Sequence, residues 1–319
     1  MIASELTALA SRLTLGPAHS FGRLTVVPLL DQAAKPSGWL TLDAALAEGQ
    51  IEVTEVSDAG SVPQLRLLNR SSSPLFLLDG EELVGAKQNR ILNLSILVPA
   101  DSNFEVPVSC VEQGRWSWRS RGFQSAGRVI YSKLRRSNAE AVSLSLRSSG
   151  SRHADQGQVW DSISIKSERM SVHSDTGAAS AIYERYRVEL DEFTVGMAVL
   201  PGQVGAAFLL DDRFAGLDLL AGPDVLAHLL PKIVRSYALD ALDDDRVHGG
   251  PDLNPGPQHE APVQVVRDAI ERISGLEASR HSALGLGEDL RLRGGSLIGS
   301  AVVSEGAIAH LGLWAGDYH

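Results

Sequence analysis

The stretch from Leu75 to Trp116 constrains the fold of this chain most, because apolar segments alternate in it with dense polar clusters. The apolar segments predict β-strands at 75–78, 83–86 and 91–98. The polar clusters span 79–82, 87–90 and 112–115. Asp79-Gly80 between two apolar segments predicts a β-hairpin over 75–86. A sheet that presents so many acids, bases and amides together predicts a functional site in this stretch.

The rest of the chain combines further strand patterns with helical ones. We expect strands at 22–30, 51–56, 63–68, 104–110, 195–199, 205–210 and within 290–314. We expect helices at the N-terminus and at 42–48, 158–169, 178–191, 223–242 and 263–273. Residues 208–217 echo the pattern of 76–86, which favours a recurring hairpin. The sequence therefore predicts an α+β fold: mostly antiparallel sheet built from recurring hairpins, with helices packed from the middle and C-terminal parts.

The length of 319 residues is enough for one large core or two smaller ones. We expect one family domain over 1–319, either undivided or built as a β-rich lobe, 1–145, and a mixed α/β lobe, 150–319. Residues 243–261 are rich in Pro, Gly and Asp, which predicts an exposed loop.

Charge and cysteine content narrow the class of protein. The net charge of −10 argues against a protein whose whole surface binds nucleic acid or a membrane non-specifically. Cys110 is the only cysteine, so an internal disulfide is excluded and a reducing compartment fits. No apolar run reaches the length of a membrane span, and the N-terminus lacks the basic start of a signal peptide. We expect a soluble cytoplasmic protein, with its oligomeric state open.

Several familiar motifs fail on spacing. Cys110 and Arg115 lie too close together for the phosphate loop of cysteine phosphatases, so Cys110 is expected to be a buried, inert thiol. The nine histidines show no metal-ligand spacing, so we expect no zinc site. The acids at 240 and 243–245 predict a helix end that runs into a solvated loop rather than a cation site.

The first surviving signal is a carboxylate next to a lysine. Glu82 and Lys87 can tune each other's pKa, which makes them candidate catalytic acid and base. Gln88, Asn89 and Arg90 supply hydrogen-bond donors that can orient a carbonyl, hydroxyl or phosphate. A charged hairpin tip with surface ion pairs is the alternative explanation of the same residues.

The second signal is a local inversion of charge. Six arginines and one lysine, with no acid, lie between Gln113 and Ala139, and Trp116 and other aromatic residues are interleaved with them. Arginines bind phosphates bidentately and aromatic rings stack bases, which favours a nucleotide or other phosphorylated ligand, or short single-stranded nucleic acid. We expect Glu112, Gln113, Arg115 and Trp116 to bind the ligand. A basic loop that pairs with the protein's own acids is the alternative.

The blocks LDGEELVGAKQNR, VSCVEQGRW, QGQVW and PKIVRSYALDAL resemble the ADP-ribosylglycohydrolase- and rhodanese-phosphatase-associated domain family over nearly the whole chain. The resemblance implies a role around NAD-derived metabolites. The expected function is binding, and processing as a hydrolase or transferase, of a small phosphorylated nucleotide derivative related to NAD or ADP-ribose. The alternative is a non-catalytic ligand sensor or a protein partner of ADP-ribose-metabolising enzymes. No metal is expected, and the resemblance names no cofactor.

Overall fold

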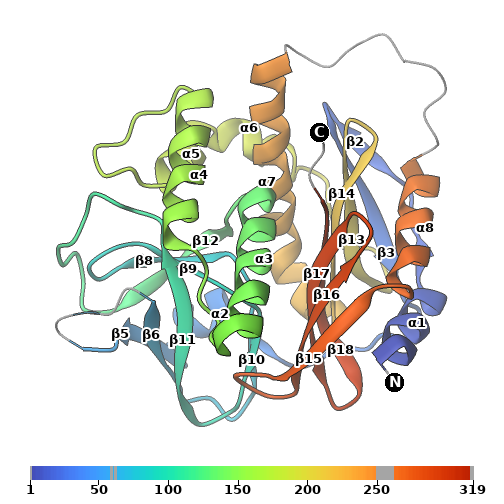
Figure 1. The fold of residues 1–319 in the computed structure, drawn as a ribbon, viewed down its shortest axis with the longest axis horizontal. Helices are drawn as coiled ribbons and strands as arrows, with labels where there is room; N and C mark the ends of the chain where they lie inside the picture. The colour runs from blue at the N-terminus through green and yellow to red at the C-terminus, as the bar shows by residue number, and fades with distance from the viewer. Residues whose placement is uncertain (1, 58–59, 61–62, 249–261, 317–319) are drawn as a thin grey trace. The chain divides into compact units, whose positions relative to one another are not determined.

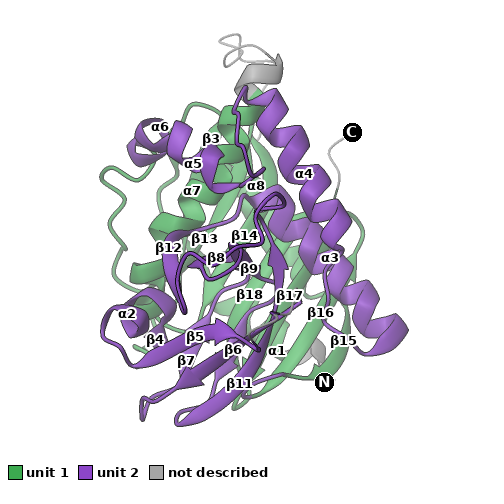
Figure 2. Cartoon of the chain, turned by 90° about the vertical axis from the view of Figure 1, so that its left-hand side faces the viewer, with its two compact units in different colours: residues 1–38, 193–283, 287–319 green, residues 39–192, 284–286 purple. Residues whose placement is uncertain are grey.

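The computed structural model describes residues 2–57, 60, 63–248 and 262–316, which form two compact units (Figures 1 and 2). Unit 1 comprises 1–38, 193–283 and 287–319, and unit 2 comprises 39–192 and 284–286. These boundaries differ from the lobes expected at 1–145 and 150–319, because the N-terminal strands pair with strands from the C-terminal half. Of the expected loop at 243–261, residues 243–248 continue a helix and the others lie outside the described residues.

Unit 1 is built on one antiparallel sheet of nine strands. Its order is β1 (Thr14–Leu15), β3 (Leu24–Leu30), β13 (Gln203–Leu210), β14 (Arg213–Leu220), β18 (Ala307–Ala315), β17 (Leu297–Ser304), β16 (Glu288–Gly294) and β15 (Glu277–Ser282). The short strand β2 (His19–Phe21) also pairs with β3. Every pairing in the sheet is antiparallel, as the sequence predicted.

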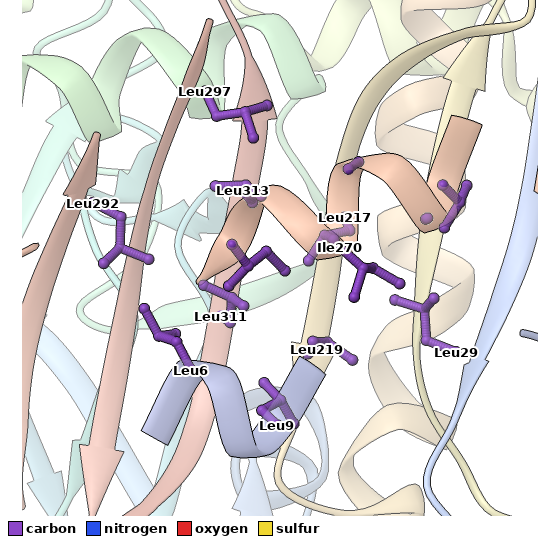
Figure 3. Close-up of a cluster of buried hydrophobic side chains, with 14 of the residues drawn as sticks. Leu6, Leu9, Leu29, Leu217, Leu219, Ile270, Leu292, Leu297, Leu311 and Leu313 are labelled. Carbon is purple, nitrogen blue, oxygen red and sulfur yellow. The ribbon is translucent and has the colours of Figure 1, made fainter. Parts of the chain in front are cut away.

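The two faces of this sheet differ because side chains alternate along a strand. One face carries an apolar core with α1 (Ile2–Arg12) and α8 (Pro262–Ile273), which Figure 3 shows with Leu6, Ile270 and Leu313. The other face packs on α7 (Pro223–His248), where the rings of Phe208 and Tyr237 stack with centroids 3.9 Å apart.

Unit 2 contains two sheets. The larger has six antiparallel strands in the order β12 (Phe123–Val129), β8 (Glu81–Gly85), β9 (Arg90–Leu92), β11 (Ser102–Cys110), β6 (Gln64–Asn69) and β5 (Ile51–Glu55). The smaller has the order β10 (Ile96–Val98), β7 (Leu75–Leu77) and β4 (Leu40–Thr41), with β4 and β7 parallel. The helices of the unit are α2 (Leu42–Ala47), α3 (Ser132–Ser149), α4 (Gln156–Arg169), α5 (Ser180–Arg185) and α6 (Arg187–Glu192).

The six-stranded sheet closes on itself. A bridge between Thr54 of β5 and Gly122, just before β12, joins its two edge strands. The strands therefore surround an enclosed core, to which Val53, Leu92 and Val108 contribute. Closure protects the edge strands from unwanted pairing and creates an interior with two ends.

The α+β class is confirmed, but the hairpin predicted at Asp79-Gly80 is wrong. β7 and β8 belong to different sheets, because the Asp79 carboxylate is held by Ser95 and Arg135 and the Gly80 N–H donates to Leu92 O. The similar pattern at 208–217 does form a hairpin, β13–β14. Apolar runs around Asp-Gly therefore marked a crossing between sheets in one case and a hairpin in the other.

Several element predictions need correction. The strand predicted over 91–98 is divided between β9 and β10 in two sheets, and the predicted strand 195–199 is irregular. The predicted helix 178–191 is broken into α5 and α6. The basic segment after Trp116 contains β12 and α3, which the sequence analysis did not predict. Among the described helices, none has the length and apolar character needed to cross a membrane.

Candidate functional site

The two polar blocks of the sequence lie side by side in unit 2. Cys110 of β11 pairs with Arg90 of β9, and beyond the strands the Arg119 N–H donates to Ala86 O at 2.9 Å. Gly85, whose φ is +132°, permits residues 120–122 to approach the turn at 86–89, since an added Cβ would lie 2.7 Å from Gly122 O. The turn at 86–89 therefore runs along the segment 115–119.

The centre of this contact is an ion pair between Glu112 and Arg115. The Arg115 Nη2 lies 2.7 Å from Glu112 Oε2, and both side chains are buried. The remaining N–H groups of Arg115 donate to the carbonyls of Ala86, Ser117 and Gly85 and to Asn89 Oδ1. Burial raises the pKa of Glu112, but the hydrogen bond and charge of Arg115 outweigh burial and leave that pKa below its ordinary value. This pair locks the two segments together.

Glu82 belongs to a second buried ion pair. Its Oε2 accepts from Arg128 Nε at 2.6 Å, and its Oε1 accepts from Asn89 Nδ2 at 3.3 Å. Burial lowers the pKa of Arg128, but the charge of Glu82 outweighs burial and raises it. Asn89 bridges the two pairs, since its Oδ1 accepts from Arg115. The contacts of Glu82 are thus with Arg128 and Asn89, and both its oxygens are occupied.

Gln88 and Arg90 form a third group with the thiol. Gln88 Oε1 accepts from Arg90 Nη1 at 2.9 Å and from Cys110 Sγ at 3.0 Å. Burial raises the pKa of the Cys110 thiol, so the neutral form is favoured. The side chain of Gln156 also pairs with both backbone groups of Cys110, at 2.8 Å each. The predicted burial of Cys110 is confirmed.

Arg90 and Glu55 leave hydrogen-bonding capacity unused. Arg90 Nε and Nη2 and both carboxylate oxygens of Glu55 are buried without a hydrogen-bond partner among the residues that the structure describes. The nearest approach between the two groups, Nη2 to Oε1, is 4.0 Å. Burial lowers the pKa of Arg90.

The surface of the site is formed by Lys87 and two tryptophans. The Lys87 Nζ lies 5.2 Å from the Trp116 ring centroid and 5.1 Å from that of Trp118. The two indoles are 48% and 43% exposed, whereas Lys87 is buried. The Arg121 guanidinium lies 5.7 Å from the Trp118 ring centroid. Arg119 is exposed, and its Nη2 lies 3.8 Å from Glu112 Oε1. We call Lys87, Trp116, Trp118, Arg119 and Arg121 the tryptophan–lysine surface.

The predicted site residues therefore fall into three groups. The buried ion-pair network consists of Glu82, Asn89, Glu112 and Arg115. Gln88 and Arg90 contact each other beside Cys110, and the buried Lys87 lies against the exposed ring of Trp116. Gln113 is exposed, and its carbonyl accepts a 3.5 Å hydrogen bond from Gln88.

Three further residues belong to the site that were not predicted from the sequence: Glu55, Trp118 and Arg128. One signal was available for Glu55, since it follows Ile51 and Val53 at the inward positions of an alternating strand. Trp118 stood beside Trp116 in the basic segment. No sequence signal pairs Arg128 with Glu82, because 46 residues separate them.

A separate group of buried polar residues lies in unit 1. Lys232, Ser236, Asp240 and Asp243 form a buried stripe on α7, so the expected solvated position of the last two is wrong. On the sheet, His310 Nε2 lies 3.2 Å from Asp218 Oδ1, and both side chains are buried. Within the described ranges no three His, Cys, Asp or Glu side chains are placed to hold a metal ion.

Comparison with known families gives one match. A family model described as the ARG and Rhodanese-Phosphatase-superfamily-associated Protein domain matches residues 12–314. The comparisons with curated proteins and with solved structures found no match. The family match includes the polar blocks of unit 2 and nearly all of unit 1. The chain therefore belongs to the ARG and Rhodanese-Phosphatase-superfamily-associated Protein domain family.

Proposed function

We propose that the tryptophan–lysine surface binds a small phosphorylated nucleotide derivative related to NAD or ADP-ribose. The observation that carries the proposal is the position of the Lys87 ammonium, 5.2 and 5.1 Å from the ring centroids of Trp116 and Trp118. Exposed indoles are favourable stacking surfaces for a base, and a lysine between them supplies charge for a phosphate.

Exposed arginines supply further positive charge for the phosphate groups of the ligand. Arg119 and Arg121 are both exposed, and the Arg121 guanidinium lies over the Trp118 ring. Arg115 takes no part in ligand binding in this proposal, because its guanidinium is buried and already donates to four acceptor residues besides Glu112. Exposed guanidinium groups can bind phosphate bidentately.

The family description supports the choice of ligand. It contains the term ARG, which we interpret as ADP-ribosylglycohydrolase. Association with an enzyme that releases ADP-ribose fits a ligand that combines a purine base with phosphates. A cytoplasmic location belongs to the same proposal and is supported by the single free cysteine.

Of the two modes considered, binding without chemical change has more support than turnover. Both oxygens of Glu82 accept hydrogen bonds, and Glu112 is paired with Arg115. A general base needs an oxygen within reach of the proton it removes, and these oxygens are engaged by protein donors. We therefore propose a ligand sensor, with hydrolase or transferase activity of the Glu82–Lys87 pair as the alternative.

Calorimetric titration with ADP-ribose, NAD, AMP and ribose 5-phosphate tests the binding. Trp118→Ala should weaken nucleotide binding by about tenfold or more, since stacking of one base contributes about 1–3 kcal/mol. Trp118→Phe should retain most of the affinity, and Lys87→Met should weaken all four ligands. Lys133→Met, at an exposed lysine on α3, is the matched control that should change none.

Mass analysis of the ligand after incubation separates the two modes. Recovery of intact ligand supports the sensor, whereas a product that disappears with Glu82→Gln supports the enzyme. If none of the four ligands binds the wild-type protein, the proposed function is wrong.

A further inference from the structure

The interior of the six-stranded sheet changes from apolar to polar at one end. Along three strands the inward positions end in a polar residue: Val53 is followed by Glu55, Leu92 is preceded by Arg90, and Val108 is followed by Cys110. Arg90 and Cys110 are also directly paired across β9 and β11. The end of this enclosed core is thus lined by a guanidinium, a carboxylate and a thiol.

The surface described above lies at the same end. The Trp116 ring centroid is 5.7 Å from Arg90 Cζ on one side and 5.2 Å from Lys87 Nζ on another. A ligand stacked on Trp116 is therefore close to the polar end of the core.

The polar end has donors and acceptors that the described residues do not satisfy. Arg90 offers two donor nitrogens, Nε and Nη2, and Glu55 offers two acceptor oxygens. All four atoms are buried. Most buried polar atoms in folded proteins have a partner, and a buried ion pair without hydrogen bonds is unfavourable. Here the two charges approach only to 4.0 Å, which leaves their hydrogen-bonding positions available to a third group.

We propose that Arg90 and Glu55 bind a neutral planar group that carries a hydrogen-bond acceptor and an N–H donor side by side. The acceptor takes hydrogen bonds from Arg90, and the N–H donates to Glu55. This inference rests on the proposed function and specifies which part of the nucleotide derivative enters the site. Trp116 contacts the same ligand, so binding changes the fluorescence of its indole.

Two parts of an NAD-related ligand have this chemistry. A nicotinamide carboxamide presents a carbonyl oxygen beside an NH₂ group, and adenine presents a ring nitrogen beside its 6-amino group. A carboxylate in place of the carboxamide lacks the donor and adds a negative charge next to Glu55, so the site disfavours it.

Matched pairs of ligands test each source by calorimetric titration. Nicotinamide mononucleotide against nicotinic acid mononucleotide tests the carboxamide, and AMP against purine riboside monophosphate, which lacks the amino group, tests adenine. We expect the wild-type protein to prefer the first member of at least one pair by tenfold or more. Ribose 5-phosphate, which has neither group, measures the contribution of the phosphate side alone.

Substitutions of Glu55 test whether the Arg90–Glu55 pair causes the preference for one ligand over the other. Glu55→Gln removes the charge that disfavours a carboxylate, so it should abolish the discrimination in the nicotinamide pair. Glu55→Met removes the acceptor, so it should abolish the discrimination in the adenine pair. Glu52→Gln, at an outward and exposed position of the same strand, is the control that should leave both preferences unchanged.

The outcomes distinguish this inference from the proposed function. If the wild-type protein binds nucleotides but does not discriminate within either pair, or if the Glu55 variants keep the discrimination, the inference is overturned and the proposed function stands. Such a result would assign the unsatisfied atoms to ordered water. If no nucleotide binds at all, both proposals fail.

Discussion

Replacement of Glu82 by glutamine separates a structural role of this carboxylate from a catalytic one. Glutamine keeps the shape of the side chain but has one oxygen, whereas two donors, Arg128 Nε at 2.6 Å and Asn89 Nδ2 at 3.3 Å, point at Glu82. One of these donors must therefore face the NH₂ group of the new side chain. The substitution also removes the buried partner of Arg128.

The structure sets the magnitude of the effect. Loss of a hydrogen bond to a charged group costs about 1.5–3 kcal/mol, and breaking a buried ion pair costs about 3–5 kcal/mol. Arg128 retains Glu184 at 3.3 Å, a carboxylate whose side chain is 67% exposed. We therefore expect Glu82→Gln to reduce the free energy of unfolding by about 2–4 kcal/mol.

Glu184→Gln is the matched control, because it changes the exposed carboxylate that contacts the same arginine. Exposed ion pairs contribute about 0–1 kcal/mol, so this variant should be close to wild type. Urea unfolding followed by tryptophan fluorescence is a suitable assay, since four of the five tryptophans, Trp39, Trp116, Trp118 and Trp160, lie in unit 2. The midpoint for Glu82→Gln should fall by about 1 M.

Equal urea midpoints for Glu82→Gln and Glu184→Gln would contradict a stabilising role of the Glu82 carboxylate. A variant of unchanged stability that nonetheless lost turnover of a ligand would show that Glu82 is catalytic. A variant that is destabilised and still binds ADP-ribose when folded would support the sensor.

Three further predictions concern the same unit. Because the folded pKa of Glu112 lies below its ordinary value of 4.5, its stabilising effect is complete above about pH 4.5 and is lost as pH falls through the folded pKa. Glu112→Gln should therefore be less stable than wild type at pH 7, with a smaller loss of stability on acidification, as measured by urea unfolding across pH. Cys110 should resist iodoacetamide in the native protein and react fully in urea, followed by mass spectrometry; rapid native labelling would contradict its burial. Gly80→Ala should cost about 2–4 kcal/mol, since its φ is +80° and the added Cβ would lie 2.9 Å from Arg135 Cγ. Gly127→Ala, at φ +66° with open space around the position, should cost only about 1 kcal/mol, so equal midpoints for the two would be inconsistent with crowding at Gly80.

Local sequence patterns were sufficient to predict a helix or strand whose position depends mainly on its own residues. The alternation of Ile51, Val53 and their polar neighbours predicted β5, and the apolar stripe on α7 predicted most of that helix. Both elements need only bury one face, so periodicity indicates them whatever lies opposite. The same reasoning failed at 91–98, because a continuous apolar run does not show that its two halves pair in different sheets.

The candidate site also combines features that local patterns predict with features that they do not. Residues 79–90 and 112–116 were identified from the sequence as polar blocks between strands, and the structure brings them into contact. The contacts that their side chains make could not be predicted from the sequence. Glu82 was paired with Lys87 because the two are close along the chain. Its carboxylate instead contacts Arg128, which the neighbouring strand β12 supplies from 46 residues further along the chain.

The α+β fold, the segments that are apolar enough to form strands and the places where polar residues concentrate all follow from the amino-acid sequence. Each of these properties depends on composition and period over a few residues. Three features appear only when the chain is folded: Asp79-Gly80 crosses between sheets, the six-stranded sheet closes, and Arg90 and Glu55 approach each other with unsatisfied atoms. Those outcomes depend on which distant strands bury one another's surfaces and on which charges that burial brings together.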